Sequence, residues 1–334
     1  MKSSWLRISL IAVAALVIVY YLGPRPATPR YDPILPSVPQ QPLQLEAYIS
    51  AKEHSHKLKP DNQARIIWND SLRRKTPYSV VYLHGFSASQ EEGDPVHQDF
   101  AKKYGCNLYL SRLDAHGLDT SEPLLTMTAT GLWEDAKEAL SIGKAIGEKV
   151  ILITCSTGGT LGLKLAATYP NDVYAVINMS PNVAINDDMA FLANNPWGLQ
   201  IARLIFKGNY RQSVPENPEI AKFWYSRYRL EAVVELENLL ESTMDPGLFH
   251  TIRQPVLNLY YFRDADHQDK TVKVSAILQM HEQLGTPADK KEAVAIPQAE
   301  AHVIGSYLTS HDVPAVERAI DSFVQNKLGL QPVK

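Results

Sequence analysis

The chain has 334 residues, of which 45% are hydrophobic and 21% are charged, and its formal net charge is −3. This composition is typical of a globular protein with room for one large α/β domain plus an insertion, or for two smaller domains. A chain without a basic surplus gives no indication of nucleic-acid binding, and two cysteines are too few for a disulfide framework.

The N-terminal residues 1–22 contain an uncharged apolar run from Ile8 to Leu22, with Lys2 and Arg7 before it. The run is short for a membrane span, and it also suits the core of a signal peptide. Because no small-x-small cleavage site follows, we expect an uncleaved signal anchor, a single transmembrane helix, rather than a cleaved signal. The small excess of positive charge in front of the run predicts that the main domain lies on the extracytoplasmic (periplasmic) side.

Seven prolines lie between residues 23 and 42. Such a stretch favours extended polyproline II and behaves as a semi-rigid spacer. Residues 23–59 are therefore expected to form a Pro-rich linker that holds the following domain away from the membrane. His54 and His56 within it could suggest a metal site, but two histidines at this spacing in a polar stretch are usually solvated.

From about residue 60, strand-like and helix-like segments alternate, with an interruption at 184–250 that is rich in helical segments and aromatic residues. The expected strands are 64–70, 78–83, 106–113, 150–155, 173–180, 255–262 and 293–297, and the expected helices are 94–104, 131–147, 158–169, 271–284 and 313–327. This alternation predicts an α/β fold, with a mostly parallel central sheet flanked by helices. The core would comprise residues 60–183 and 251–330, and residues 184–250 would be a helical cap or lid insertion.

Ser156 stands where the buried strand 150–155 meets the next helix. A nucleophile elbow of the G-x-S-x-G type needs this strand–turn–helix context and small residues on both sides of the nucleophile. Gly158 meets the second requirement, whereas Thr154 replaces the first glycine. The alternative role for Ser156 is to cap the helix. Shifting the frame to Cys155 puts larger residues at both small positions, so Ser156 is the better candidate nucleophile.

His84-Gly85-Phe86 directly follows the strand 78–83. Acyl transfer develops negative charge on an oxygen, which needs backbone N–H donors held in place. One donor is expected from the residue after the nucleophile and one from this earlier loop, namely Thr157 and Phe86. The alternative is an ordinary turn that uses Gly85.

The expected base is His302, which follows the last predicted strand and precedes the final helix. His281 falls inside a predicted helix, and His311 opens the last helix, where a capping or surface role is expected. A histidine that acts as base needs a carboxylate to orient it and to stabilise its charged form.

Three aspartates follow the strand 255–262, and we rank Asp269 first, Asp264 second and Asp266 third as the acid. The remaining two would then be loop or helix-cap carboxylates. The order along the chain is Ser156, Asp269 and His302, which differs from the two common serine-protease orders.

Together these motifs resemble those of the α/β-hydrolase superfamily, in particular the branch of bacterial carboxylesterases, monoacylglycerol lipases and related serine hydrolases. The residues that carry the resemblance are His84-Gly85-Phe86, Asp114-Ala115-His116-Gly117, Cys155-Ser156-Thr157-Gly158-Gly159, Asp269-Lys270-Thr271-Val272 and Ala301-His302-Val303. The second of these is similar to the R-G-H-G-x-S loop of that branch. The resemblance covers roughly residues 60–328 and departs at Thr154 and in the longer loop before Asp269.

These residues predict a serine hydrolase that cleaves carboxylic esters through an acyl-Ser156 intermediate, with no cofactor and no metal. A peptidase, amidase, thioesterase or acyltransferase could use the same triad, and a non-catalytic binding protein on the same fold is a weaker alternative. The aromatic residues in 184–250 suggest an apolar acyl pocket. Medium-chain or lipid-derived esters are therefore the expected substrates, and the membrane is the expected further partner.

Overall fold

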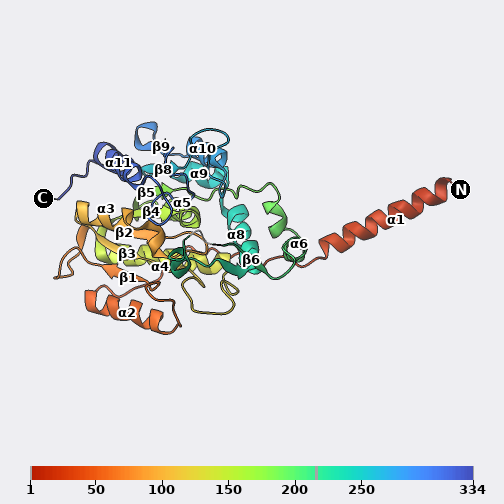
Figure 1. Cartoon of the computed structure of the whole chain (residues 1–334), viewed down its shortest axis with the longest axis horizontal. Helices are drawn as coiled ribbons and strands as arrows, with labels where there is room; N and C mark the ends of the chain where they lie inside the picture. The colour runs from red at the N-terminus through yellow and green to blue at the C-terminus, as the bar shows by residue number, and fades with distance from the viewer. Residues whose placement is uncertain (1, 215–216, 334) are drawn as a thin grey trace.

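The computed structural model describes residues 2–214 and 217–333, without the side chains of residues 2–4, 6 and 7. A seven-stranded sheet forms its centre, with helices on both faces (Figure 1). The strands of this sheet are β1 Arg65–Ile67, β2 Thr76–Leu83, β3 Asn107–Leu110, β4 Gly147–Cys155, β5 Val173–Met179, β8 Val256–Tyr260 and β9 Lys291–Ala295. Their order is β1-β3-β2-β4-β5-β8-β9, and all neighbouring pairs are parallel apart from β1 and β3. The predicted α/β fold is confirmed.

The helices divide the core into two layers. The α-helices are α1 Lys2–Tyr21, α2 Pro42–His54, α3 Val96–Tyr104, α4 Ala129–Ile146, α5 Thr157–Thr168, α6 Gly198–Ile205, α7 Ile220–Phe223, α8 Leu230–Thr243, α9 Pro246–Thr251, α10 Val274–Gln283 and α11 Val313–Phe323. Along β4, Val150 and Leu152 pack in the same cluster as residues of α4, α5 and α10, whereas Ile151 and Ile153 pack with residues of α3 and α11. This alternation explains why 150–155 is apolar throughout, since a central parallel strand is buried on both faces.

Residues 184–251, which we call the cap, contain the short helix η2 Ala190–Asn194, helices α6 to α9, and a two-stranded hairpin of β6 Tyr210–Gln212 and β7 Arg227–Arg229. Helices α8 and α9 of this segment pack in the same hydrophobic cluster as α4, α5 and α10. The hairpin was not expected from the sequence, because its strands are short and carry several charged residues. Arg229 joins it to the core through an ion pair with Glu122 at 2.6 Å.

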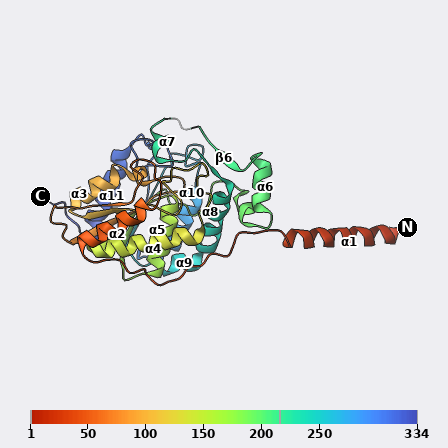
Figure 2. The same ribbon diagram turned by 90° about the horizontal axis from the view of Figure 1, so that it is seen from below.

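The Pro-rich residues 23–41, called the strap here, lie along the domain between α1 and α2 (Figure 2). Four main-chain carbonyl groups of the strap accept hydrogen bonds from side chains of α4, α5, α8 and their flanks. These bonds are Asn238 Nδ2 to Ala27 O at 2.9 Å, Trp133 Nε1 to Asp32 O at 3.1 Å, Tyr169 Oη to Pro33 O at 3.0 Å and Lys137 Nζ to Ile34 O at 3.0 Å. The strap therefore packs on the domain and does not extend away from it as the spacer expectation had it.

Helix α2 lies within the segment that we expected to be a linker. Pro42 occupies the first turn, where its missing N–H costs no hydrogen bond, and Leu45, Ile49 and Glu53 are buried on one face. The spacing of these three residues places them one above another along the helix. The same spacing is visible in the sequence and would have predicted a helix anchored to the domain.

The expectation of a membrane anchor at residues 1–22, with the domain on the extracytoplasmic side, is wrong. None of the helices in the described part of the chain is both long and apolar enough to cross a membrane.

Candidate active site

Ser156 lies at the turn between β4 and α5, at the carboxyl edge of the sheet. Its φ of 51° and ψ of −117° are a strained conformation for a residue with a side chain. Its N–H donates to Met179 O on the neighbouring strand at 3.1 Å. Glycine is required at position 158, because a Cβ there would lie 1.9 Å from Leu83 O. This geometry is typical of a nucleophile elbow.

The threonine at the first glycine position of the elbow motif fits for two local reasons. Thr154 Oγ1 donates to Asn178 Oδ1 on β5 at 2.7 Å, which satisfies its buried hydroxyl. Its methyl group faces Gly162 of α5, where a Cβ would come within 2.9 Å of it. Gly162 thus provides the space that the missing first glycine would otherwise have to provide.

Cys155 is fully buried and packs in the cluster below the sheet, with residues of α3 and α11. Burial raises the pKa of its thiol well above the ordinary value, so the nucleophilic thiolate is disfavoured. These two properties suit a core residue and not a nucleophile.

His302 and Asp269 meet at the same edge of the sheet, from the loops after β9 and β8. His302 Nδ1 lies 2.7 Å from Asp269 Oδ2, and Asp269 is almost completely buried. Asp269 Oδ1 accepts from the N–H groups of Thr271 and Val272 at 2.8 and 3.1 Å. Burial alone would raise the pKa of Asp269, but the charge of His302 and these hydrogen bonds outweigh it and leave the pKa below its ordinary value. Asp269 is therefore an ionised carboxylate that is held in place by two main-chain N–H groups and hydrogen-bonded to His302.

The other candidates for the acid and the base lie away from this pair. Asp264 and Asp266 are exposed, and Asp264 bonds to His267 at 2.7 Å. His281 of α10 lies 3.1 Å from Asn258 on β8, and His311 is exposed beside Glu300. Because Asp264 faces solvent, it has no access to His302 in this conformation.

Ser156 and His302 line one cavity of about 580 Å³ between the sheet edge and the cap. Its cap wall is mainly apolar, with side chains such as Leu192, Ile201 and Phe206. Among the described residues no hydrogen bond joins Ser156 Oγ to His302, a contact that in hydrolases commonly tightens only in the substrate complex. Since Nδ1 of His302 is engaged by Asp269, Nε2 is the nitrogen left for Ser156.

The charge state of His302 gives this site an expected pH dependence. Burial lowers the pKa of His302, but the neighbouring Asp269 charge and hydrogen bond outweigh it, so the pKa lies above its ordinary 6.5. A general base must be neutral, and His302 becomes protonated as the pH falls through this raised pKa. We therefore expect kcat/KM to fall about tenfold per pH unit on the acid side, with its midpoint above pH 6.5. A pH–rate profile that stays flat down to pH 5 would contradict this assignment.

The two expected N–H donors lie beside Ser156. Thr157 opens α5, and Phe86 lines the cavity in the loop after β2. In the described part of the chain neither N–H is engaged by another acceptor, so both remain available. The ring of Phe86 packs edge-on against Tyr228 of the cap, with centroids 5.0 Å apart.

Two buried histidines hold the loop that carries Phe86. His84 Nε2 accepts from Leu113 N at 3.1 Å, and His116 Nε2 accepts from Ser87 N at 3.0 Å. Burial lowers the pKa of His84 to about 4, and it lowers the pKa of His116 well below the ordinary value. Both rings are thus neutral acceptors, which gives the His-Gly motif and the Asp-Ala-His-Gly motif a structural role.

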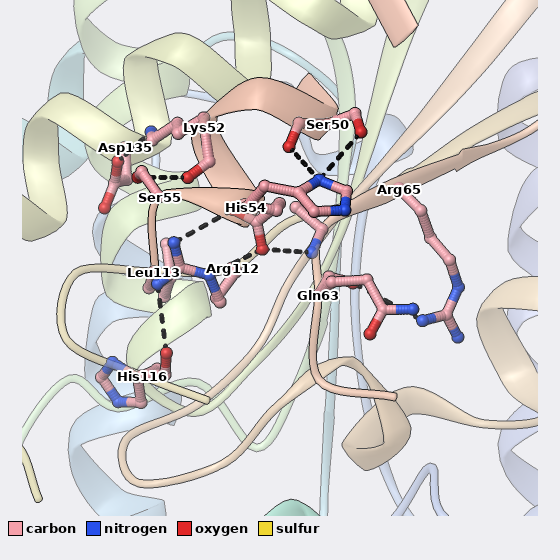
Figure 3. A network of polar contacts seen from close by, with 12 residues as sticks. Ser50, Lys52, His54, Ser55, Gln63, Arg65, Arg112, Leu113, His116 and Asp135 are labelled. Carbon is pink, nitrogen blue, oxygen red and sulfur yellow. Dashed lines mark hydrogen bonds and ion pairs between the residues drawn. The ribbon is translucent and has the colours of Figure 1, made fainter. Parts of the chain in front are cut away.

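A buried ion pair connects this loop to α2, a helix in the segment that was expected to be a linker. Arg112 Nε and Nη2 donate to the two carboxylate oxygens of Glu53 at 2.8 and 3.0 Å, and its Nη1 donates to His116 O at 3.2 Å. Figure 3 shows Arg112 above the His116 carbonyl group, with Lys52 of α2 bonded to Asp135 nearby. His54 in the same view bonds to Ser50 of its own helix. Glu53 therefore supports the active-site loop from a distance.

Comparison with solved structures gives a consistent result for the fold. No protein-family model matches the sequence, and no curated protein matches it either. A metagenome-derived lipolytic enzyme from the study of LipS and LipT is similar over 80% of this chain and 100% of its own, with a TM-score of 0.64 and 17% identity. The monoacylglycerol lipase of Paleococcus ferrophilus is similar over 79% of this chain and 98% of its own, with a TM-score of 0.57 and 16% identity. Est1E of Butyrivibrio proteoclasticus with bound ferulic acid is similar over 80% of this chain and 95% of its own, with a TM-score of 0.54 and 17% identity.

The chain has the α/β-hydrolase fold. Enzymes with the α/β-hydrolase fold carry their nucleophile, acid and base in the order Ser, Asp or Glu, His along the chain. Ser156, Asp269 and His302 follow this order, and each lies in a loop at the carboxyl edge of the sheet. At identities of 16 to 17% the likeness shows the fold alone.

Proposed function

We propose that this protein is a serine hydrolase that cleaves carboxylic esters through an acyl-Ser156 intermediate. One observation carries the proposal. A serine in a strained turn shares a cavity with a histidine whose other ring nitrogen is bonded to a buried carboxylate. A nucleophile, a base and an orienting acid are the parts that acyl transfer requires.

The proposed reaction has two steps. His302 Nε2 takes the proton of Ser156 as the oxygen attacks the ester carbon, and it then gives that proton to the leaving alcohol. Asp269 fixes the tautomer of His302 and stabilises the imidazolium that forms. The N–H groups of Phe86 and Thr157 bind the oxyanion of the tetrahedral intermediate. In the second step His302 takes a proton from water, which attacks the acyl carbon. The bond to the Ser156 oxygen then breaks, and His302 returns the proton to that oxygen as the acid leaves.

The cavity supports an ester with an apolar acyl chain. Its cap wall is lined by aliphatic and aromatic side chains, which favour burial of a hydrocarbon group. The neighbours with similar folds include lipolytic enzymes, an esterase and a monoacylglycerol lipase, and their names point to ester substrates. Peptidase, thioesterase and acyltransferase activities would use the same three residues, and no feature of the described cavity favours them.

A panel of chromogenic substrates tests the proposal. We expect the protein to hydrolyse p-nitrophenyl butyrate and octanoate and to leave the matching p-nitroanilides intact, because p-nitrophenoxide is a far better leaving group than the amine of an anilide. Thioesters of the same acids and an alcohol acceptor form the other arms of the test. Faster turnover of the anilide or the thioester than of the ester would overturn the ester assignment. A protein that turns over none of them would support the binding-protein alternative.

A further inference from the structure

Glu92 is a buried carboxylate beside the catalytic residues that the mechanism above does not use. It lies in the short helix η1 Gln90–Gly93, is 2% exposed, and lines the same cavity as Ser156 and His302. Its Oε2 accepts from the N–H of Gly85, in the loop that carries Phe86. A Cβ on Gly85 would lie 2.7 Å from Glu92 Oε1 and 2.9 Å from Ser156 Cβ. Only a glycine therefore fits between this carboxylate and the nucleophile.

The groups that face Glu92 leave it with one possible positive partner. Tyr82 of β2 lies 3.4 Å from its carboxylate, and Cys155 of β4 is a further neighbour. The pKa of each of these two groups is raised well above its ordinary value by burial, so both are neutral. His97 of α3 packs against Tyr82, and burial lowers its pKa to about 4, so it is neutral as well.

Few charged groups lie near Glu92. Asp94 follows η1 and carries negative charge, so it cannot stabilise a second carboxylate. Within the described residues no lysine or arginine forms an ion pair with Glu92. His302 is the remaining group that can become positive. Its charge lowers the pKa of Glu92, and the charge of Glu92 raises the pKa of His302.

We propose that Glu92 is a second carboxylate of this active site, a positioning residue that acts through the loop that carries Phe86 and through His302. Its Oε2 fixes the Gly85 N–H and so orients the Phe86 N–H toward the oxyanion. Its charge adds to that of Asp269 when His302 takes the Ser156 proton. This inference rests on the proposed roles of Ser156 and His302.

The carboxylate and the imidazole are expected to titrate as a linked pair. Burial raises the pKa of Glu92 to about 7, although the Gly85 N–H and the His302 charge oppose this rise. An ionised Glu92 favours the protonated form of His302, because opposite charges in a dry site attract strongly. Removing the Glu92 charge should therefore make His302 easier to deprotonate.

The variants Glu92→Gln and Glu92→Leu separate the two actions. Glutamine keeps an acceptor for the Gly85 N–H and removes the charge. We expect the acid limb of kcat/KM to move about one unit toward lower pH, with kcat several-fold lower and KM within about twofold. Leucine removes the acceptor too, and we expect a further drop of about tenfold in kcat from the loosened loop. Glu91→Gln is the matched control, because Glu91 is bonded to Tyr307 outside the cavity.

Two outcomes would overturn the inference. The first is a Glu92→Gln profile with an unchanged acid limb, and the second is an equal shift in Glu91→Gln. The pH dependence of fluorophosphonate labelling and an NMR titration of the His302 ring give the same information without any ester. If the wild type hydrolyses no ester while Glu92→Gln still lowers the pKa of His302, the proposed function fails and the coupling stands. If Glu92→Leu does not fold, Glu92→Gln alone decides.

Discussion

Replacing Ser156 with alanine is expected to abolish labelling by a fluorophosphonate probe and to lower kcat for ester hydrolysis by about 10⁶-fold. The probe reacts with a serine only when a base can take its proton and donors can hold the developing oxyanion. Alanine removes the oxygen that forms the acyl bond. The elbow itself should survive, because its hydrogen bond is made by the main-chain N–H of residue 156.

Ser180→Ala is a matched control for this variant. Ser180 directly follows the neighbouring strand β5, is buried, and also has a positive φ, of 47°. It does not line the cavity, so its loss should leave labelling and kcat close to those of the wild type. Labelling that persists in Ser156→Ala, or that disappears in Ser180→Ala, would refute the assignment of Ser156. Cys155→Ala tests the alternative nucleophile and should stay active.

Replacing Asp269 with asparagine is expected to lower kcat by about 10⁴-fold. The asparagine amide would present an N–H to His302 Nδ1, where the carboxylate now accepts. The ring would then carry its proton on Nε2 and could no longer take the proton of Ser156. The asparagine oxygen can still accept from the Thr271 and Val272 N–H groups, so the loop should keep its shape.

Asp264→Asn provides the comparison for Asp269→Asn. Asp264 is exposed and bonded to His267, so we expect kcat of the Asp264→Asn variant to stay within about twofold of the wild type. Equal losses of kcat in the two variants would show that the acid is not Asp269 alone. Unfolding curves of both proteins distinguish lost chemistry from a lost fold.

The sheet could be predicted because each strand has a strong local signal. The segment 150–155 is uniformly apolar and is the central strand β4, which is buried on both faces. The order of the candidate residues was visible for a related reason, since each one lies in the turn or loop that follows a strand. Parallel strands bring their carboxyl ends to one edge, so residues that are far apart in sequence were expected to meet.

The parts that the sequence did not predict depend on tertiary contacts. Glu92 sits in a polar stretch that resembles an ordinary surface turn, and its burial depends on the loops around it. The apolar run at 8–22 gave a wrong prediction because its apolar character and the missing cleavage site were weighted above its short length, which was visible in the sequence. Glu53 was overlooked because many prolines nearby suggested a linker, although its spacing with Leu45 and Ile49 was regular.

The contacts of the strap also determine which of its residues can be substituted during evolution. Four of its contacts with the domain are made by carbonyl oxygens of the main chain, which every amino acid possesses. Others are made by its side chains, since Tyr31 bonds to Ser242 and packs edge-on against Trp133, and Val38 is buried in the core. An extended backbone without internal hydrogen bonds leaves these oxygens free, and prolines limit the conformations that the unfolded segment can adopt. Substitution of the strap side chains other than Tyr31, Leu35 and Val38 should therefore be tolerated as long as the segment stays extended. The four carbonyl contacts depend on Trp133, Lys137, Tyr169 and Asn238 of the domain, so we expect these four residues to vary less than the strap that they hold.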